Sequence, residues 1–390
     1  MSELTFETIE QWNQTQGAAA AIDRLVETLQ ADKDYHKLFD ALLIKKKFEM
    51  GVSLVRPTSF DDVPQEKQEE FEEHYVDTAR TIGLLFLEQK NIPQAWIYLR
   101  TIREIEPVKQ AIEEIEISRE PSEETEELLN IALHEGAHPV KGLEMMLATH
   151  GTCNTVTALD QTINQLSPED RHRAAGLLIT VLYDDLKYTL QQEVQQKFAT
   201  ESPAETIREL MTGRDWLFEE GNYHIDVSHL SAVVRFSRFL NPGNSMLQKA
   251  MELAEYGSHL ADQFQYPADP PFDDFYPAHV QFFKVLADQD RDEGLAYFQN
   301  KLDSVPDEDD KPMIAYVLVD LLTRIGRLDE AVEPAERYLK NVDESSGFSF
   351  TQLCQEAGRM DVLLNAAREK GDLVAFTAAL LQTGSESVPA

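Results

Sequence analysis

The chain has 390 residues, of which 42% are hydrophobic and 27% are charged, a composition typical of folded proteins and not of disordered ones. Its 70 acidic and 35 basic residues give a formal net charge of -35, so nucleic acid is not an expected partner. The only cysteines, Cys153 and Cys354, exclude a disulfide framework.

The N-terminal sequence is acidic and polar, and the chain contains no uninterrupted apolar run long enough to span a bilayer. These features predict a cytoplasmic protein that does not enter a membrane. The negative charge leaves two explanations open. It favours basic peptides, basic protein surfaces or divalent cations as ligands, and it equally fits an adaptation to solubility or salt.

Helical periodicity recurs along the whole chain and strand patterns are nearly absent, which predicts an all-α fold. The first strong pair is AAAAIDRLVETLQ (18–30) and YHKLFDALLIKKKFEMG (35–51), which we expect to pack antiparallel and to stop at Gly51. VRPTSFDDVPQE (55–66) predicts a long loop. Further helices are expected near 66–89, 93–105, 108–117 and 122–135.

A strong helix start follows in the centre of the chain. Ser167 is a suitable N-cap and Pro168 suits the first helical position, so the longest helix is expected here. YPADPPFDDFYP (266–277) contains four prolines and predicts a packed boundary. The predicted organisation is a helix pair (1–52), repeat-like helices (53–120), an irregular central helical block (121–265), a connector (266–277), C-terminal repeats (278–380) and a flexible tail (381–390).

Three segments share one pattern of small and large residues. The pattern lies on Ala79, Gly83, Phe86, Ala95, Leu99, Ile102 and Pro107, again on Ala278, Phe282, Val285, Gly294, Phe298 and Pro306, and again on Ala315, Val319, Leu322, Ala331, Ala335 and Tyr338. Small residues at Ala95, Gly294 and Ala331 allow the second helix of each pair to approach the first closely. Lys301 departs from the pattern at an otherwise apolar position.

This pattern resembles the tetratricopeptide-repeat (TPR) family. The resemblance implies antiparallel helix hairpins stacked into a right-handed superhelix, whose concave face binds a peptide or a partner protein. It implies no catalysis and no cofactor. The chain departs from the family because it lacks the early tryptophan, because Ala278 and Ala315 are 37 residues apart where about 34 is usual, and because the central third has no clear register.

One stretch, IALHEGAHPVKG, matches the H-E-x-x-H core of zinc peptidases at His134, Glu135 and His138. That chemistry needs both histidines on one uninterrupted helix. Gly136 favours a helix end, and Pro139 disfavours helical conformation at His138. We therefore expect one helix to end here and the next to begin at Pro139.

A second cluster combines polar and aromatic residues between 215 and 229. A binding pocket with His224, Asp226 and His229 around a metal or an anion is one interpretation. In the other, Asp226 or Ser228 caps the next helix, Trp216 and Tyr223 pack in the core, and the histidines bond buried carbonyls. Asp215 belongs to the same cluster.

A third segment, ATHGTCNTVTALD (148–160), places His150 three residues before Cys153. A Cys-His nucleophile needs hydrogen-bond contact between the two groups, which this spacing does not establish. We expect a small-residue helix with Cys153 buried. The sequence contains no phosphate-binding loop, no dinucleotide fingerprint and no G-x-S-x-G motif.

Two functions remain in view. The favoured one is a non-enzymatic scaffold in the cytoplasm that binds a protein or peptide, possibly a basic one. The alternative is a metal or small-molecule site, possibly hydrolytic, in the central block between His134 and His229. Candidate ligand-binding residues are Asp215, Trp216, Tyr223, His224, Asp226, His229 and His150.

Overall fold

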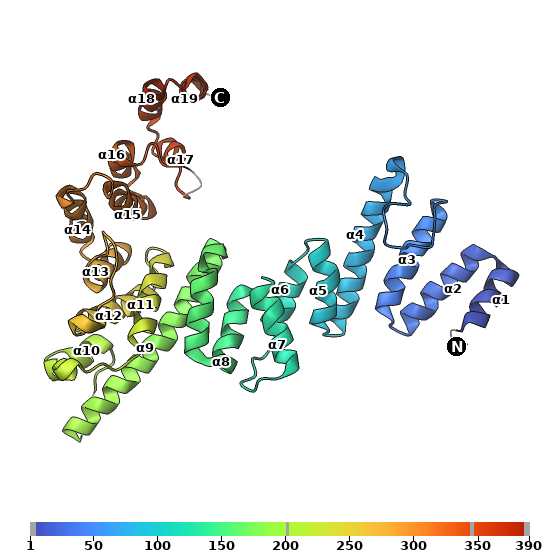
Figure 1. The fold of residues 1–390 in the computed structure, drawn as a ribbon, viewed down its shortest axis with the longest axis horizontal. Coiled ribbons are helices and arrows are strands. Elements are labelled where there is room, and N and C mark those ends of the chain that lie inside the picture. Colours follow the sequence, from blue (N-terminus) through green and yellow to red (C-terminus); the bar gives the residue numbers. More distant parts are fainter. Residues whose placement is uncertain (1–4, 200–202, 344–346, 386–390) are drawn as a thin grey trace. The chain divides into compact units, whose positions relative to one another are not determined.

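The computed structural model describes residues 5–199, 203–343 and 347–385, and within these ranges it is built from helices without a β-strand (Figure 1). The all-α class is therefore confirmed. The chain divides into two compact units, Met1–Thr155 and Val156–Ala390. The division falls inside the block 121–265 that the sequence presents as irregular.

In the first unit, α1 to α5 each pack against the next helix along the chain, and α7 packs on α5. Phe71, Ile82, Leu99 and Ile112 are fully buried in its core. The helices are α1 (Phe6–Gln16), α2 (Ala18–Ala31), α3 (Tyr35–Glu49), α4 (Gln65–Glu88), α5 (Ile92–Thr101), α6 (Glu106–Glu113) and α7 (Glu123–Leu129), followed by a π-helical turn (Asn130–His134) and by α8 (Pro139–Thr162).

Turns in this unit follow the sequence signals. The predicted pair 18–30 and 35–51 forms α2 and α3, which pack against each other. Gly51 has a φ of 67° just after the end of α3, a conformation that glycine adopts without strain. The segment between Gly51 and Gln65 is irregular, as predicted. α8 is interrupted at Gly151, where φ is 79°.

The second unit begins with the end of α8 and then contains the longest helix of the described chain. Its helices are α9 (Pro168–Phe198), α10 (Ile207–Met211), α11 (Val227–Phe236), α12 (Met246–Ser258), α13 (Phe275–Leu286), α14 (Arg291–Ser304), α15 (Lys311–Arg324), α16 (Leu328–Tyr338), α17 (Phe350–Glu356), α18 (Met360–Lys370) and α19 (Leu373–Ser385). The N-cap prediction for α9 is confirmed, because the Ser167 hydroxyl accepts the N–H of Asp170 at 3.1 Å.

Helix α9 is the common packing partner of the helices in the first half of this unit. Its leucines Leu178, Leu182, Leu186 and Leu190 are buried at a spacing of four residues, which places them on one helical face. Helices α10, α11 and α12 pack against α9. The sequence of α9 thus supplies one apolar face to several shorter partners.

From α12 to α19, each helix packs against the next one along the chain. The predicted close approach is confirmed at Gly294, where an added Cβ would lie 2.6 Å from Cγ2 of Val285. Lys301, the departure from the apolar pattern, is neutralised by ion pairs with Asp273 and Asp274. The pairing of neighbouring helices therefore continues through the C-terminal part of the chain.

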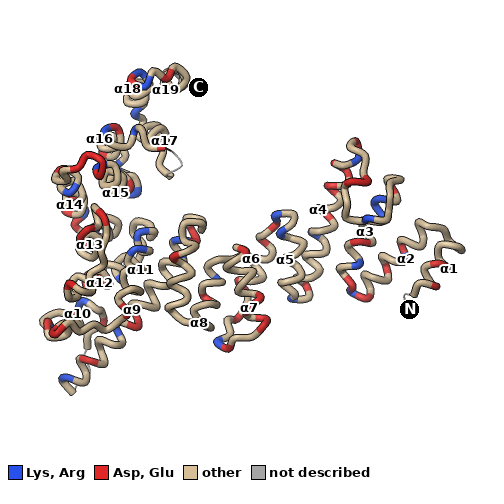
Figure 2. The backbone as a smooth tube through the Cα atoms, in the orientation of Figure 1, with Lys and Arg blue, Asp and Glu red and all other residues tan. Residues whose placement is uncertain are grey.

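Two of the predicted segments overlap helices of the structure. Residues 275–277 of the expected connector form the first turn of α13, while 266–274 are not helical. Residues 381–385 of the expected tail continue α19, and 386–390 lie outside the described residues. Acidic residues are distributed along the helices of both units (Figure 2). In the described ranges, no helix is both long and apolar enough to cross a bilayer.

Candidate functional site

The segment with the H-E-x-x-H letters does not form one helix. The π-helical turn ends at His134, and Gly136 then adopts a φ of 79°. α8 begins at Pro139. This confirms the predicted junction between two helices, so the two histidines do not share the uninterrupted helix that the peptidase chemistry requires.

Glu135 makes structural hydrogen bonds at this junction. Its Oε2 accepts from Trp96 Nε1 at 2.6 Å and from Arg100 Nη1 at 2.5 Å. Its Oε1 accepts from Asn130 Nδ2 at 2.9 Å. The carboxylate that would activate a metal-bound water in a peptidase therefore binds α5 to the helix junction.

The neighbouring histidines lie in different surroundings. His138 is buried, with its Nε2 at 2.6 Å from Glu113 Oε2, and its Nδ1 accepts the backbone N–H of Lys141 at 3.3 Å. His134 is exposed. The first histidine of the motif is therefore at the surface, whereas the second links α6 to the start of α8 through its contact with Glu113.

His150 and Cys153 flank the interruption of α8. Nδ1 of His150 lies 2.8 Å from the Thr149 hydroxyl, and Nε2 lies 3.5 Å from Glu126 Oε1. Cys153 is exposed, so the expectation of a buried thiol is wrong. Cys153 lies on the solvent side of the second part of α8, whereas Thr155 and Val156 on the same part are buried.

In the second cluster, His224 is the most buried candidate. Its Nε2 lies 2.7 Å from Glu193 Oε2, and both its backbone N–H and its Nδ1 contact the Tyr256 hydroxyl, at 2.8 Å and 3.0 Å. Burial lowers the pKa of His224, and Glu193 opposes this effect. The prediction that this histidine bonds a carbonyl is wrong, because a carboxylate on α9 and a hydroxyl on α12 take that place.

Asp226 caps α11, as one interpretation of the sequence predicts. Its Oδ1 accepts the backbone N–H groups of Ser228 at 2.8 Å and of His229 at 3.2 Å. The Ser228 hydroxyl also donates to it, and these bonds lower the pKa of the Asp226 carboxyl. The side chain of Asp226 is therefore used locally at the helix N-terminus.

The aromatic residues of the cluster are only partly in the core. Trp216 is half-buried, and Lys197 Nζ lies 3.6 Å from its ring centroid, a cation–π contact. Tyr223 is 50% exposed and its ring contacts Phe264, so its predicted core position is wrong. Asp215 is exposed at the start of a short 3-10 segment.

These candidates do not meet in one place. Across residues 5–199, 203–343 and 347–385, no three His, Cys, Asp or Glu side chains gather closely enough to hold a metal ion. Several of them instead have partners close by, such as Glu193 for His224, Ser228 for Asp226 and Thr149 for His150. The sequence-derived candidates therefore do not build a shared site.

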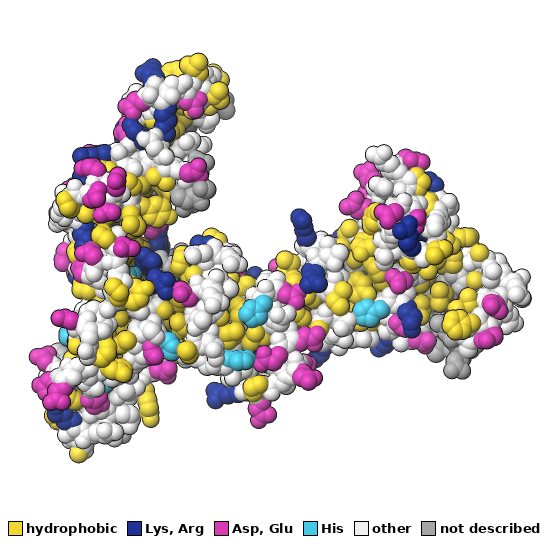
Figure 3. All heavy atoms as spheres, in the orientation of Figure 1, with side chains coloured by type: hydrophobic (Ala, Val, Ile, Leu, Met, Phe, Trp, Pro, Cys, Tyr) yellow, Lys and Arg dark blue, Asp and Glu magenta, His cyan; other side chains and the backbone are white. Residues whose placement is uncertain are grey.

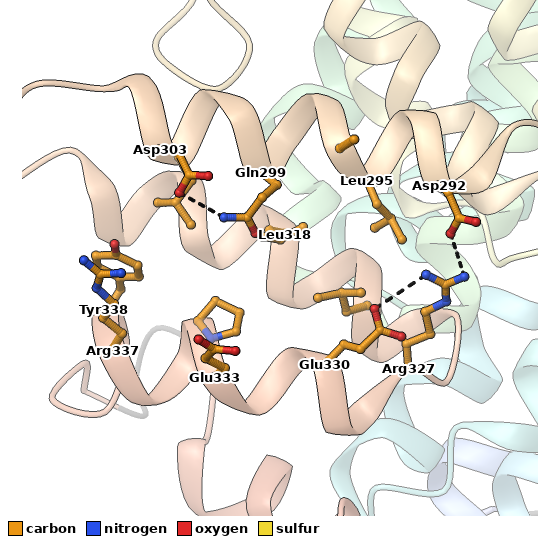
Figure 4. A pocket seen from close by; sticks show the side chains of 14 residues that line it. Asp292, Leu295, Gln299, Asp303, Leu318, Arg327, Glu330, Glu333, Arg337 and Tyr338 are labelled. Atoms are coloured by element: carbon orange, nitrogen blue, oxygen red, sulfur yellow. Dashed lines mark hydrogen bonds and ion pairs between the residues drawn. The ribbon is translucent and has the colours of Figure 1, made fainter.

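A different feature, which we call the acidic groove, lies across α14, α15 and α16 (Figure 4). It encloses about 520 Å³. Its floor is formed by buried leucines, and its rim carries four carboxylates and two guanidinium groups. The lining residues are Asp292, Leu295, Ala296, Gln299, Leu302, Asp303, Leu318, Leu322, Arg327, Glu330, Glu333, Pro334, Arg337 and Tyr338.

Ion pairs at one end of the groove hold the rim in position. Nη2 of Arg327 lies 2.7 Å from Asp292 Oδ1, and Nη1 lies 3.6 Å from Glu330 Oε2 (Figure 4). The hydrogen bond with Asp292 raises the pKa of Arg327. Further along, Asp303 accepts from Gln299 Nε2 at 3.0 Å. Most of the rim is therefore already paired within the protein.

Glu333, in the middle of the groove, differs from the other carboxylates. It is exposed and has no basic partner in the part of the chain that the structure describes. Pro334 lies beside it inside α16 and has no N–H to donate, so the Glu330 carbonyl lacks its usual helical donor. The groove thus presents the carboxylate of Glu333 without a basic partner in the described ranges, beside the proline of α16.

Comparison with known proteins does not add a relative. No family model, no curated protein and no solved structure matches this chain.

The acidic groove is the feature that sequence reasoning misses. Its residues come from three helices, and their convergence depends on how those helices pack. One signal is visible in the sequence, because Pro334 interrupts an otherwise helical pattern between Glu333 and Ala335. The spacing of Glu330, Glu333 and Arg337 also places them on one helical face.

Proposed function

We propose that this protein is a non-enzymatic interaction protein, that its helix pairs form TPR-like repeats, and that the acidic groove binds a basic segment of a partner protein. The consecutive packing of α12 to α19 supports the repeat arrangement. The close approach of α13 and α14 at Gly294 supports it as well. No step of this proposal needs a cofactor.

The observation that carries the proposal is the exposed carboxylate of Glu333, which lines the acidic groove and has no basic partner among the described residues. A carboxylate accepts strong hydrogen bonds from lysine or arginine. A basic side chain of a ligand supplies such donors. An acidic ligand would meet four carboxylates on the rim.

The apolar floor of the acidic groove indicates that the ligand also carries apolar side chains. Leu302, Leu318 and Leu322 are each at most 4% exposed and line the groove beneath the charged rim. Such a floor favours a ligand that also buries an apolar side chain. The volume of about 520 Å³ suits a few side chains, so we propose a short peptide stretch with basic and apolar residues.

Peptide selection tests this function. A phage library that displays random 16-residue peptides is selected for binding to the wild-type protein. It is then depleted of peptides that bind Glu333→Lys. Peptides rich in Lys or Arg with interspersed apolar residues are expected, because they match the rim and the floor. Glu73→Lys is the matched control, since Glu73 is an exposed glutamate of α4 in the first unit.

Depletion on Glu73→Lys should remove the same peptides from the pool, because that variant keeps the acidic groove intact. The proposal fails if depletion on Glu333→Lys removes the wild-type binders as completely as depletion on Glu73→Lys does, or if the pool shows no enrichment in basic residues.

A further inference from the structure

Arg327 and Arg337 are the two guanidinium groups of the acidic groove, and they differ in their partners. The chain has 70 acidic and 35 basic residues, and Lys and Arg side chains lie beside Asp and Glu side chains over α14 to α16 (Figure 3). Arg327 accordingly pairs with both Asp292 and Glu330. Arg337 is exposed and forms no hydrogen bond or ion pair with any residue of 5–199, 203–343 and 347–385.

Tyr338 adds a second donor beside Arg337. The hydroxyl of Tyr338 has no hydrogen-bond partner within the described structure. Cζ of Arg337 lies 5.0 Å from the Tyr338 ring centroid, and Figure 4 shows both side chains at the same end of the groove. A guanidinium and a phenol both donate hydrogen bonds, and one carboxylate can accept from both. This end of the groove is therefore suited to an acidic group.

Glu333 lies four residues before Arg337 on α16, and both side chains line the groove. Residues at this spacing on a helix can pair with each other, but these two described side chains form no ion pair. Four helical positions correspond to about 6 Å along the helix axis. The groove thus presents a negative site and a positive site one helical turn apart.

We infer that the groove selects a partner segment that carries both charges, in which a basic side chain binds Glu333 and an acidic side chain two positions away binds Arg337. A segment of a few residues does not keep a helix in water. In an extended segment, side chains two positions apart lie on the same side and about 7 Å apart, which matches the spacing on α16.

A uniformly basic segment fits this groove less well. It would bring a like charge against Arg337, and a like charge at a binding site disfavours the ligand that carries it. The inference rests on the proposed function, because Glu333 holds the basic side chain in both. It adds that Arg337 determines which basic segments bind.

Peptides from the same phage library, selected on the wild type without depletion, provide the probe. We expect an Asp or Glu two positions before or after a Lys or Arg in most of them, since the segment can run in either direction. One such peptide is labelled with fluorescein and made in two versions. The parent version keeps the acidic residue, and the neutral version carries Asn or Gln in its place.

Fluorescence anisotropy of both peptides with wild type and Arg337→Gln gives a double-mutant cycle. Neutralising the peptide should weaken its binding to the wild type about fivefold. Arg337→Gln should weaken the parent peptide by a similar factor. The two changes together should cost no more than either one, because each removes the same contact. Tyr338→Phe should weaken the parent peptide and leave the neutral peptide unchanged.

Arg368→Gln is the matched control. Arg368 is exposed, has no carboxylate partner in the part of α18 and its surroundings that the structure describes, and its Cζ lies 4.9 Å from the Phe376 ring centroid. This variant should bind the parent peptide like the wild type, because Arg368 does not line the groove.

Two results would overturn the inference and leave the basic-peptide function in place. One is a pool of basic peptides without an acidic residue at this spacing. The other is a neutralised residue that costs the same affinity on Arg337→Gln as on the wild type. A pool without basic peptides would overturn the proposed function as well.

Discussion

Nζ of Lys47 lies 2.6 Å from the backbone carbonyl oxygen of Arg56, inside the first unit. The Lys47 side chain is fully buried, and its amine also donates to the carbonyl of Ser59 at 2.7 Å. Burial lowers the pKa of Lys47, and the two carbonyls together with the Phe71 ring compensate its charge. One amine thus fixes the irregular segment between α3 and α4.

Replacing Lys47 should release this segment. Lys47→Met keeps the apolar stem but leaves two carbonyls without their donor, so we expect a loss of about 2 to 3 kcal/mol in the free energy of unfolding. Hydrogen exchange of residues 53–64 should accelerate. Lys45→Met is the control, because the Lys45 pair with Asp23 is exposed and should cost less than about 1 kcal/mol. Equal costs for the two variants would contradict this account.

The contact between α12 and α13 depends on a glycine. An added Cβ at Gly257 would lie 2.3 Å from Cδ1 of Tyr276, so Gly257→Ala should destabilise the second unit by at least about 2 kcal/mol. Gly176→Ala on α9 is the matched control, because its nearest neighbour is 4.0 Å away. That change should stabilise by about 0.5 to 1 kcal/mol. Urea denaturation measures both, and effects of the same sign would be inconsistent with the packing.

His279 should make stability depend on pH. It is 1% exposed among Phe272, Phe275 and Phe283, and burial, aided by Arg238, lowers its pKa to about 3. The unfolded chain, with a histidine pKa of about 6.5, binds the proton first as pH falls. Stability from His279 is therefore full above about pH 6.5 and declines below it, by up to about 1.4 kcal/mol per pH unit.

His279→Phe removes this titration while keeping an aromatic ring in the cluster. Between about pH 6 and pH 4, its free energy of unfolding should fall less steeply than that of the wild type. Comparing the two proteins separates His279 from the carboxylates, which titrate in both. Parallel curves would show that His279 is protonated in the folded state.

Substitutions at the junction between the π-helical turn and α8 should change the free energy of unfolding according to the contacts that each residue makes. Glu135→Ala removes the acceptor of Trp96 Nε1 and of Arg100, with an expected cost of about 1 to 3 kcal/mol. His134→Ala, at an exposed position, should cost less than about 0.5 kcal/mol. A chelator should leave the unfolding midpoint unchanged. Destabilisation by the chelator and by both substitutions would instead indicate a bound metal.

Local sequence signals predict local structure well in this chain. Gly136 and Pro139 predict the junction after His134, and Ser167 predicts the start of α9, because caps and breakers act through the backbone of neighbouring residues. The all-α class follows from the periodicity in the same way. Such features depend on a few adjacent residues, which the sequence presents directly.

Contacts between helices are harder to predict. The partner of His224 is Glu193 on α9, and no spacing in the sequence connects the two. Tyr223 lies in the irregular segment before α11 and is exposed, and Cys153 is exposed just after the interruption of α8 at Gly151. The acidic groove needs three helices to converge. These features depend on packing, so they become visible only in three dimensions.

The most direct test of the proposed function is a titration of a basic peptide, selected on the wild type without depletion, against wild type, Glu333→Lys and Glu73→Lys, followed by fluorescence anisotropy. We predict equal affinity for wild type and Glu73→Lys, and affinity weaker by about tenfold for Glu333→Lys, because a lysine there repels the peptide and removes the unpaired carboxylate. The wild-type affinity should fall as salt rises. Equal binding of the peptide by Glu333→Lys and wild type would contradict the account.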